Sequence, residues 1–126
     1  NDNQVKQIII YINNHYQEKI TVKGLAHHFG YNPDYLSRRF KGQVGISIVD
    51  YMYVVRLNKL YDDLLHTNTA IRQLFIKNGL HNPRTARRIF QQMFGKLPNE
   101  LRQERWMWLS AGINGVHQKR SSGAVT

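Results

Sequence analysis

The chain has 126 residues, enough for one ordinary domain or two small lobes and too few to favour a large catalytic cleft. Its 18 Lys and Arg residues against 8 Asp and Glu residues give a formal charge of +10, which favours a polyanionic partner, nucleic acid first. No cysteine is present, so disulfides, thiolate zinc sites and a cysteine nucleophile are excluded.

Helices are predicted from apolar residues that recur every three or four positions, and no strand pattern competes with them. In chain order these helices cover residues 5–16, 22–29, 33–44, 48–66, 70–77, 83–94 and 98–109. Thr21 and Ser47 are side-chain caps in front of the second and fourth helices, and Gly30 ends the second. Beyond Ser110 the glycine and serine content rises and the periodicity fades, so we expect a flexible tail over residues 110–126.

An internal repeat relates the two halves of the chain. Asn32-Pro33 and Asn82-Pro83 each combine a capping side chain with proline at the first helical position. The same separation of 50 residues relates the arginine, phenylalanine and glycine positions that follow: Arg38 and Arg88, Phe40 and Phe90, Gly45 and Gly95. A short helix, a turn that contains glycine and a capped second helix form the helix-turn-helix pattern, so the repeat predicts two such lobes.

We therefore expect an all-α fold in which two homeodomain-like helix-turn-helix lobes are joined by a long connecting helix. The bipartite domain covers residues 1–109, with lobe one at about 5–46, the connecting helix at 47–66 and lobe two at about 69–109. A helix of that length spans about 28 Å, close to the roughly 34 Å between successive major grooves. One chain can therefore contact two adjacent grooves on one side of a duplex, without a palindromic site.

Both lobes carry residues typical of one bacterial family. In lobe one and the connecting helix these residues are Leu25, Ala26, Tyr35, Leu36, Ser37, Arg38, Phe40, Lys41, Gly45, Tyr51, Arg56 and Leu57. In lobe two they are Ile71, Gly79, Arg88, Phe90, Gly95, Pro98 and Arg102. With these residues the chain resembles the AraC/XylS family of transcription regulators over about residues 5–105. The resemblance implies a bipartite DNA-binding domain that regulates transcription, in a family whose members often carry a sensor or dimerisation domain as well.

Lobe two departs from the family pattern at several core positions. Phe75 stands where the family usually has alanine, Asn78 where it is apolar, Leu80 where it has phenylalanine, and Ala86 where it has a large apolar residue. Because volume-conserving exchanges are the best tolerated in cores, we expect Phe75 to fill the space that Ala86 releases.

The two helices that begin at the Asn-Pro signals have matching outward faces. Spacing of three and four residues buries Leu36, Phe40 and Val44 in one helix and Ala86, Ile89, Phe90 and Met93 in the other. The outward residues are then Asp34, Ser37, Arg38 and Lys41, and Arg84, Arg87, Arg88 and Gln91. The family resemblance implies that these outward faces enter the major groove.

Arginine presents two parallel donors that match guanine O6 and N7, which makes the outward arginines candidates for base readout. The candidate base readers are Ser37, Arg38, Arg84, Arg87, Arg88 and Asp34. Asp34 has two interpretations, since it can accept from cytosine N4 or simply favour the helix dipole. The candidate phosphate contacts are Arg39, Lys41, Gln91 and Lys96.

The sequence offers no constellation for catalysis or for a cofactor. It has no candidate nucleophile with a base, no paired carboxylates and no phosphate-binding glycine loop, so an enzyme is not expected. Six histidines are present, but adjacent His27 and His28 splay about 100° apart on a helix, whereas zinc needs three or four convergent ligands. Neither a metal nor another cofactor is expected.

Double-stranded DNA is the expected partner, and the resemblance adds RNA polymerase as a candidate. No apolar run approaches the roughly 18 residues of a membrane span and no signal peptide is evident, so we expect a cytoplasmic protein. The resemblance implies a bacterial protein that is located at the nucleoid through DNA. Because the chain begins at Asn1 rather than Met, an upstream effector-binding or dimerisation domain is also a candidate. Two alternatives stay open: a basic helical protein-interaction module, and the DNA-targeting part of a multidomain enzyme.

Overall fold

The computed structural model describes residues 2–122 of the chain and, within them, the side chains of residues 3–112. This described part contains helices and turns but no strand, which confirms the all-α class. The helices are α1 (Asp2–His15), α2 (Val22–Phe29), α3 (Pro33–Val44), α4 (Ile48–His66), α5 (Ile71–Lys77), α6 (Pro83–Phe94) and α7 (Pro98–Ser122).

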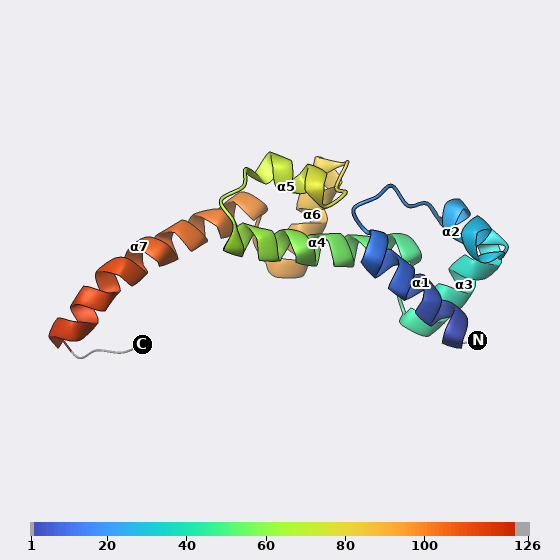
Figure 1. Cartoon of the computed structure of the whole chain (residues 1–126), viewed down its shortest axis with the longest axis horizontal. Coiled ribbons are helices and arrows are strands. Elements are labelled where there is room, and N and C mark those ends of the chain that lie inside the picture. The colour runs from blue at the N-terminus through green and yellow to red at the C-terminus, as the bar shows by residue number, and fades with distance from the viewer. Residues whose placement is uncertain (1, 123–126) are drawn as a thin grey trace.

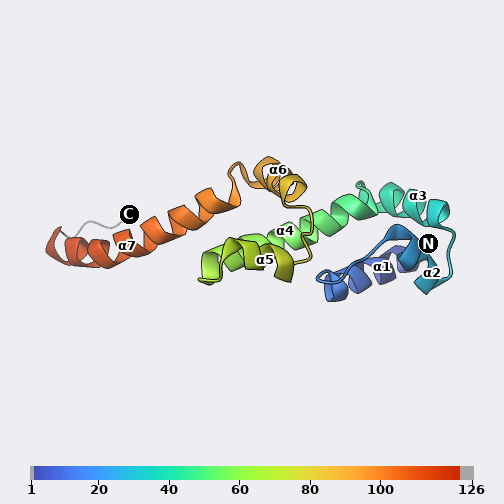
Figure 2. The same cartoon turned by 90° about the horizontal axis from the view of Figure 1, so that it is seen from above.

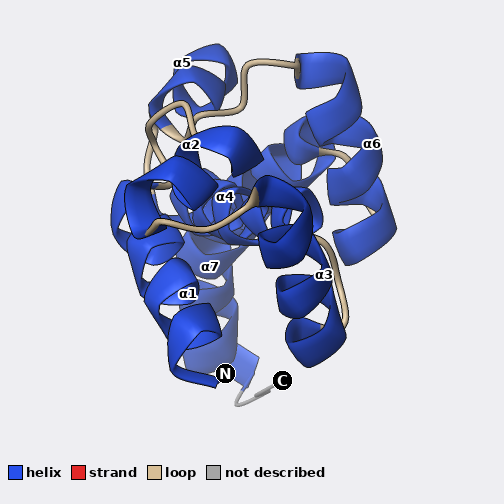
Figure 3. Ribbon diagram, turned by 90° about the vertical axis from the view of Figure 1, so that its right-hand side faces the viewer, coloured by secondary structure: helices blue, strands red, loops and turns tan. Residues whose placement is uncertain are grey.

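Helix α4 runs through the middle of the elongated molecule, with one lobe at each end (Figure 1). Lobe one consists of α1, α2, α3 and the first half of α4. Lobe two consists of the second half of α4, α5, α6 and the start of α7. The view from above and the view along the long axis both place α3 and α6 on the same side of α4 (Figures 2 and 3).

Each lobe has its own hydrophobic core, and α4 contributes to both. The core of lobe one contains Val5, Ile8, Ile12, Leu25, Ala26, Leu36, Phe40, Ile48 and Met52. The core of lobe two contains Leu57, Leu60, Leu64, Leu74, Phe75, Leu80, Ala86, Phe90 and Leu101. The buried face of α4 therefore passes from one core to the other between Met52 and Leu57.

The capping residues act as the sequence predicts. The Asn32 side chain accepts hydrogen bonds from the backbone N–H groups of Asp34 and Tyr35, at 2.9 and 3.2 Å. The Asn82 side chain accepts one from Thr85 at 3.2 Å, so both Asn-Pro signals start helices. Gly45 and Gly95 end these helices with φ of 93° and 77°, in the left-handed region that glycine adopts most readily.

The last helix differs from its expected length. The sequence analysis ends this helix near Leu109 and expects a flexible tail after it, whereas α7 continues to Ser122. Propagation adds one hydrogen bond for each residue, so Ser110 and Gly112 weaken a helix that is already nucleated without ending it. Residues 123–126 of the expected tail lie outside the described residues.

Two arginines near the start of α7 donate hydrogen bonds to backbone carbonyl oxygens at and just after the end of α4. Arg102 is 4% exposed and donates to the carbonyl oxygens of Leu64 and Thr69, at 3.1 and 2.8 Å. Burial, with the nearby positive charge of Arg105 as a smaller cause, lowers the pKa of Arg102 from its usual value. Arg105 donates to the carbonyl oxygen of Leu65 at 2.6 Å. Just beyond it, the four side chains from Trp106 to Leu109 are exposed.

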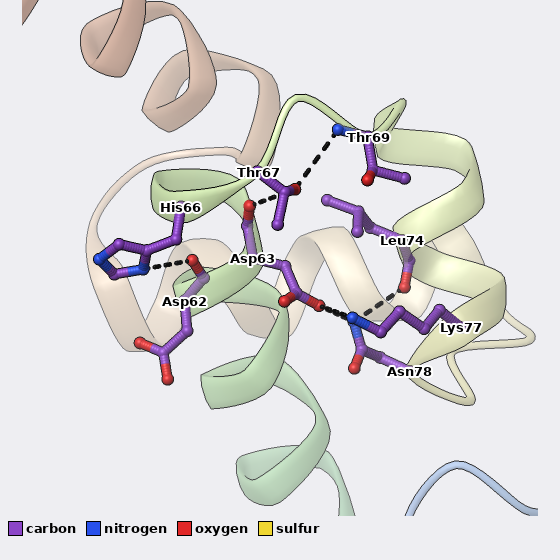
Figure 4. A network of polar contacts seen from close by, with 8 residues as sticks. All are labelled: Asp62, Asp63, His66, Thr67, Thr69, Leu74, Lys77 and Asn78. Atoms are coloured by element: carbon purple, nitrogen blue, oxygen red, sulfur yellow. Dashed lines mark hydrogen bonds and ion pairs between the residues drawn. The ribbon is translucent and has the colours of Figure 1, made fainter. Parts of the chain in front are cut away.

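Asn78, one of the departures from the family pattern, is fully buried and ties α5 to α4 (Figure 4). Its side-chain nitrogen donates to Asp63 Oδ2 at 3.0 Å and to the carbonyl oxygen of Leu74 at 2.9 Å. Lys77 Nζ lies 3.3 Å from the same Asp63 oxygen. The buried Asn78 is therefore held by a polar contact with Asp63 of α4.

We expect Asp63→Ala to lower the free energy of unfolding by about 1–3 kcal/mol, because it leaves one N–H of the buried Asn78 amide without its acceptor. Denaturant unfolding followed by circular dichroism measures the change. Asp62→Ala is the matched control, since the side chain of Asp62 is exposed and His66 bonds to its backbone carbonyl oxygen, which the substitution keeps. Equal stability of the two variants would contradict a structural role for the Asp63–Asn78 contact.

Candidate nucleic-acid interface

The outward face of α3 is polar and accessible. Asp34, Arg38 and Lys41 are exposed and Ser37 is partly buried, while Leu36 and Phe40 on the opposite face lie in the core of lobe one. The division of this helix into a buried and an outward face is therefore confirmed.

Helix α6 repeats this arrangement with more positive charge. Arg84, Arg87, Arg88 and Gln91 are exposed, whereas Ala86 and Phe90 have no exposed surface. Four of the sequence-predicted site residues thus share one exposed face of α6, and α6 lies on the same side of α4 as α3 (Figure 3).

The outward arginines are free of carboxylate partners among the described side chains. The salt bridges there join His15 to Glu18, Lys77 to Asp63 and Lys96 to Glu104. Arg38, Arg84 and Arg88 take part in none of them, so no internal ion pair has to break before their guanidinium groups meet an external anion or a base edge. This arrangement favours recognition of a polyanion.

Arg87 is the outward arginine that contacts the core of its lobe. Its guanidinium carbon lies 5.3 Å from the centroid of the Phe75 ring, within the range of a cation–π contact. Phe75 is 3% exposed and replaces the alanine that is usual in the family. The aromatic substitution therefore lies beneath one of the candidate base readers.

The four candidate phosphate contacts occupy different environments. Lys41 and Gln91 are exposed. Lys96 Nζ lies 2.6 Å from Glu104 Oε2, and this hydrogen bond raises the pKa of Lys96 above its usual value. Arg39 is partly buried, and its Nε atom has no hydrogen-bond partner among the described residues. Lys96 therefore has a competing carboxylate, whereas Lys41 does not.

Lobe two also has a cavity of about 780 Å³ beside the start of α6. Ile71, Phe75 and Leu80 form part of its apolar wall, and Arg72, His81 and Arg87 contribute polar groups. Sequence reasoning assigned no role to Arg72 or His81. Arg72 belongs to a run from residue 64 to residue 99 that contains six Lys or Arg residues and no acid, and this run is the sequence signal that could have indicated Arg72.

Comparison with known proteins shows the family of this domain. Residues 25–104 match the family described as helix-turn-helix domain. The chain belongs to the AraC-type helix-turn-helix family. The family match supports DNA binding by this domain. Its two helix-turn-helix units are α2–α3 and α5–α6, so α3 and α6 are their second helices.

Relatives of this AraC-type domain occur in several bacteria. YtdP, an uncharacterized HTH-type transcriptional regulator of Bacillus subtilis (strain 168), is 32% identical in an alignment of 108 positions that covers 82% of this chain and 14% of YtdP. The C-terminal domain of AraT, a response regulator from Geobacillus stearothermophilus, has a TM-score of 0.75 and 27% identity, over 81% of this chain and 85% of that one. A probable AraC family transcriptional regulator from Rhodopseudomonas palustris CGA009 has a TM-score of 0.75 and 26% identity, over 82% of this chain and 97% of that one.

The AraC-type domain is only part of what its curated relatives contain. It spans 14% of the length of those relatives it matches.

Within the described residues, no group of three or more His, Asp or Glu side chains is arranged to hold a metal ion. None of the helices in that part of the chain has the length and hydropathy needed to cross a bilayer.

We expect Lys41→Ala to weaken binding to all duplex sequences alike and to reduce the slope of log affinity against log salt by about one, because it removes one phosphate contact. Lys96→Ala is the comparison, since its ammonium group is paired with Glu104 and we expect a smaller change in the slope. Fluorescence anisotropy titrations at several salt concentrations measure both slopes. A larger change for Lys96→Ala than for Lys41→Ala would contradict this ranking.

Proposed function

We propose that this AraC-type domain binds duplex DNA with α3 and α6 in successive major grooves on one side of the duplex. The observation that carries this proposal is the position of both helices on the same side of α4 (Figure 3). Arg38 on α3 and Arg84 and Arg88 on α6 are exposed and free of carboxylate partners among the described side chains. An α4 of 19 residues has a length of about 28 Å, which suits adjacent grooves.

In this complex the two lobes read separate blocks of bases. Arg38, with Ser37 beside it and Asp34 near the helix start, reads the block that α3 contacts. Arg84, Arg87 and Arg88 read the block that α6 contacts, where each bidentate arginine–guanine pair contributes about 1–3 kcal/mol of discrimination. Because the two outward faces differ, the binding site is asymmetric.

The phosphate contacts hold the domain in register on the duplex. Lys41 and Gln91 are the best placed, since both are exposed and lie on the recognition helices. Arg39 contributes through the part of its side chain that reaches the surface. Lys96 contributes least, because it must first leave Glu104.

The domain serves transcription regulation as the DNA-binding part of a longer protein in the bacterial cytoplasm. An effector-binding or dimerisation domain outside this chain controls its affinity, and RNA polymerase is the partner at the promoter. The family membership supports this proposal, as does the small share of the relatives' length that the chain spans.

A duplex titration tests the proposal. A preferred sequence is selected from a random duplex pool with the 126-residue chain, and its affinity is compared with that of a scrambled duplex over a range of salt concentrations. We expect a preference of at least about a thousandfold for the selected sequence and a steep fall of log affinity with log salt. Equal affinity for both duplexes, or tighter binding to an acidic protein than to either, contradicts the proposal.

A further inference from the structure

The two lobes touch each other directly as well as through α4. Gly79, in the turn between α5 and α6, is buried against the loop between α1 and α2. A Cβ atom at Gly79 would lie 2.8 Å from the carbonyl oxygen of Tyr16 and 3.2 Å from that of Gln17. Figure 1 shows this loop of lobe one reaching toward the turn of lobe two, and the view from above agrees (Figure 2).

Arg56 of α4 also takes part in this contact between the lobes. Its Nε donates to the carbonyl oxygen of Tyr16 at 2.7 Å, and its Nη2 donates to that of Glu18 at 2.8 Å. The same Nε would lie 3.1 Å from a Cβ atom at Gly79. The guanidinium group therefore packs between the loop of lobe one and the turn of lobe two, and burial lowers the pKa of Arg56.

Two separate requirements select glycine at position 79. Its φ is 74°, and its N–H closes the C-terminal turn of α5 by donating to the carbonyl oxygen of Ile76 at 3.2 Å. The close approach of the Tyr16 carbonyl leaves no room for a side chain. Gly95 has nearly the same φ of 77° but nothing within 4 Å of an added Cβ atom. The steric requirement is therefore particular to the contact between the lobes.

We propose that this lobe junction, formed by Tyr16, Gln17, Glu18, Arg56 and Gly79, sets the spacing between the two blocks of bases that the domain recognises. The proposal rests on the proposed binding of α3 and α6 in successive grooves. Helix α4 alone connects the lobes end to end and leaves bending and twisting motions between them. The junction is a second point of attachment to the side of α4, and it restrains both motions.

A restrained pair of lobes discriminates between operator spacings. One added base pair moves the second block by about 3.4 Å along the duplex and turns it by roughly 35° about the axis. A rigid domain can then no longer place α3 and α6 on their two blocks at the same time. We expect about a tenfold loss of affinity for each base pair of displacement. A domain with a loosened junction binds its best site more weakly but tolerates displacement, with a loss of about threefold or less.

The test measures affinity for duplexes in which the spacer between the two selected blocks is shortened or lengthened by one base pair at a time. Arg56→Met and Gly79→Ala disrupt the lobe junction. Arg102→Met is the matched control for the first, because Arg102, like Arg56, donates to two backbone carbonyl oxygens, but within lobe two. Gly95→Ala is the control for the second, because it introduces the same backbone strain where the space is open.

We expect both junction variants to flatten the dependence of affinity on spacing and both controls to keep the steep wild-type dependence. Junction variants that keep the wild-type dependence overturn the proposal, and so do controls that flatten it to the same extent. A wild-type chain whose affinity does not depend on spacing instead contradicts two-block recognition itself, so that the two failures are distinguishable.

A distance measurement tests the same proposal without DNA. The chain has no cysteine, so spin labels can be attached at Gly42→Cys in α3 and Gln92→Cys in α6, both of which are exposed positions. We expect the distribution of distances between the labels to be narrow in the otherwise unchanged chain and at least about twice as broad with Arg56→Met. A distribution of equal width in both overturns the proposal, and Arg102→Met again serves as the control.

Discussion

Arg38→Ala and Arg88→Ala are expected to relax base discrimination at different blocks of the same DNA site. Each variant removes one exposed guanidinium from one recognition helix, and a bidentate arginine–guanine pair contributes about 1–3 kcal/mol, or roughly 5- to 150-fold. Competition titrations against duplexes with single base changes in each block measure the loss. We expect Arg38→Ala to tolerate changes only in the block that α3 contacts, and Arg88→Ala only in the block that α6 contacts.

Lys41→Ala is the control for this pair of variants, because a lost phosphate contact weakens all sequences alike. The assignment of Arg38 and Arg88 as base readers is wrong if either variant lowers the affinity for every duplex by the same factor. If a single variant tolerates base changes in both blocks, the proposal that each lobe reads its own block is contradicted.

Phe75→Ala is expected to lower the free energy of unfolding by about 3–5 kcal/mol, the usual cost of removing a buried aromatic side chain. Phe75 is 3% exposed and lies in the same core as Ala86, which has no exposed surface. Because Ala86 is small, nothing at that position can fill the space that the lost ring leaves. Denaturant unfolding of the chain measures the change.

Ile76→Ala is the control for the Phe75 variant. The Ile76 side chain is next to Phe75 in the sequence but is 64% exposed, so its removal leaves no cavity. A Phe75→Ala chain that is as stable as the wild type, or more stable, would contradict the expectation that Phe75 compensates for Ala86. Alanine, the residue usual in the family at this position, would then suit this core as well.

The boundaries of α3 and α6 were predictable because the signals that set them are local, whereas α1 begins three residues before the predicted start at Val5. Asn32 and Asn82 cap residues only two or three positions away, and Gly45 and Gly95 end the same helices through their own backbone conformation. The division of α3 and α6 into buried and outward faces follows from helical spacing and was equally predictable. The end of α7 was not, because glycine and serine lower helix propensity without supplying a stop signal.

The pairing of side chains at the candidate interface could not be predicted in the same way. Lys96 and Glu104 are eight positions apart on either side of a helix start, so no helical spacing brings them together. The packing of Arg87 on Phe75 and of Gly79 on Tyr16 depends on how separate elements pack against each other. Periodicity within one helix holds no information about such contacts.

Helix α4 also limits how this domain can change during evolution. Its residues enter two separate cores along one continuous helix, so one residue inserted between Met52 and Leu57 turns everything after it by about 100° and moves it by about 1.5 Å. Such a rotation carries α6 away from the side on which α3 lies. An insertion or deletion in α4 would therefore change the relative position of α3 and α6, whereas a substitution on an outward face of α3 or α6 leaves that position unchanged.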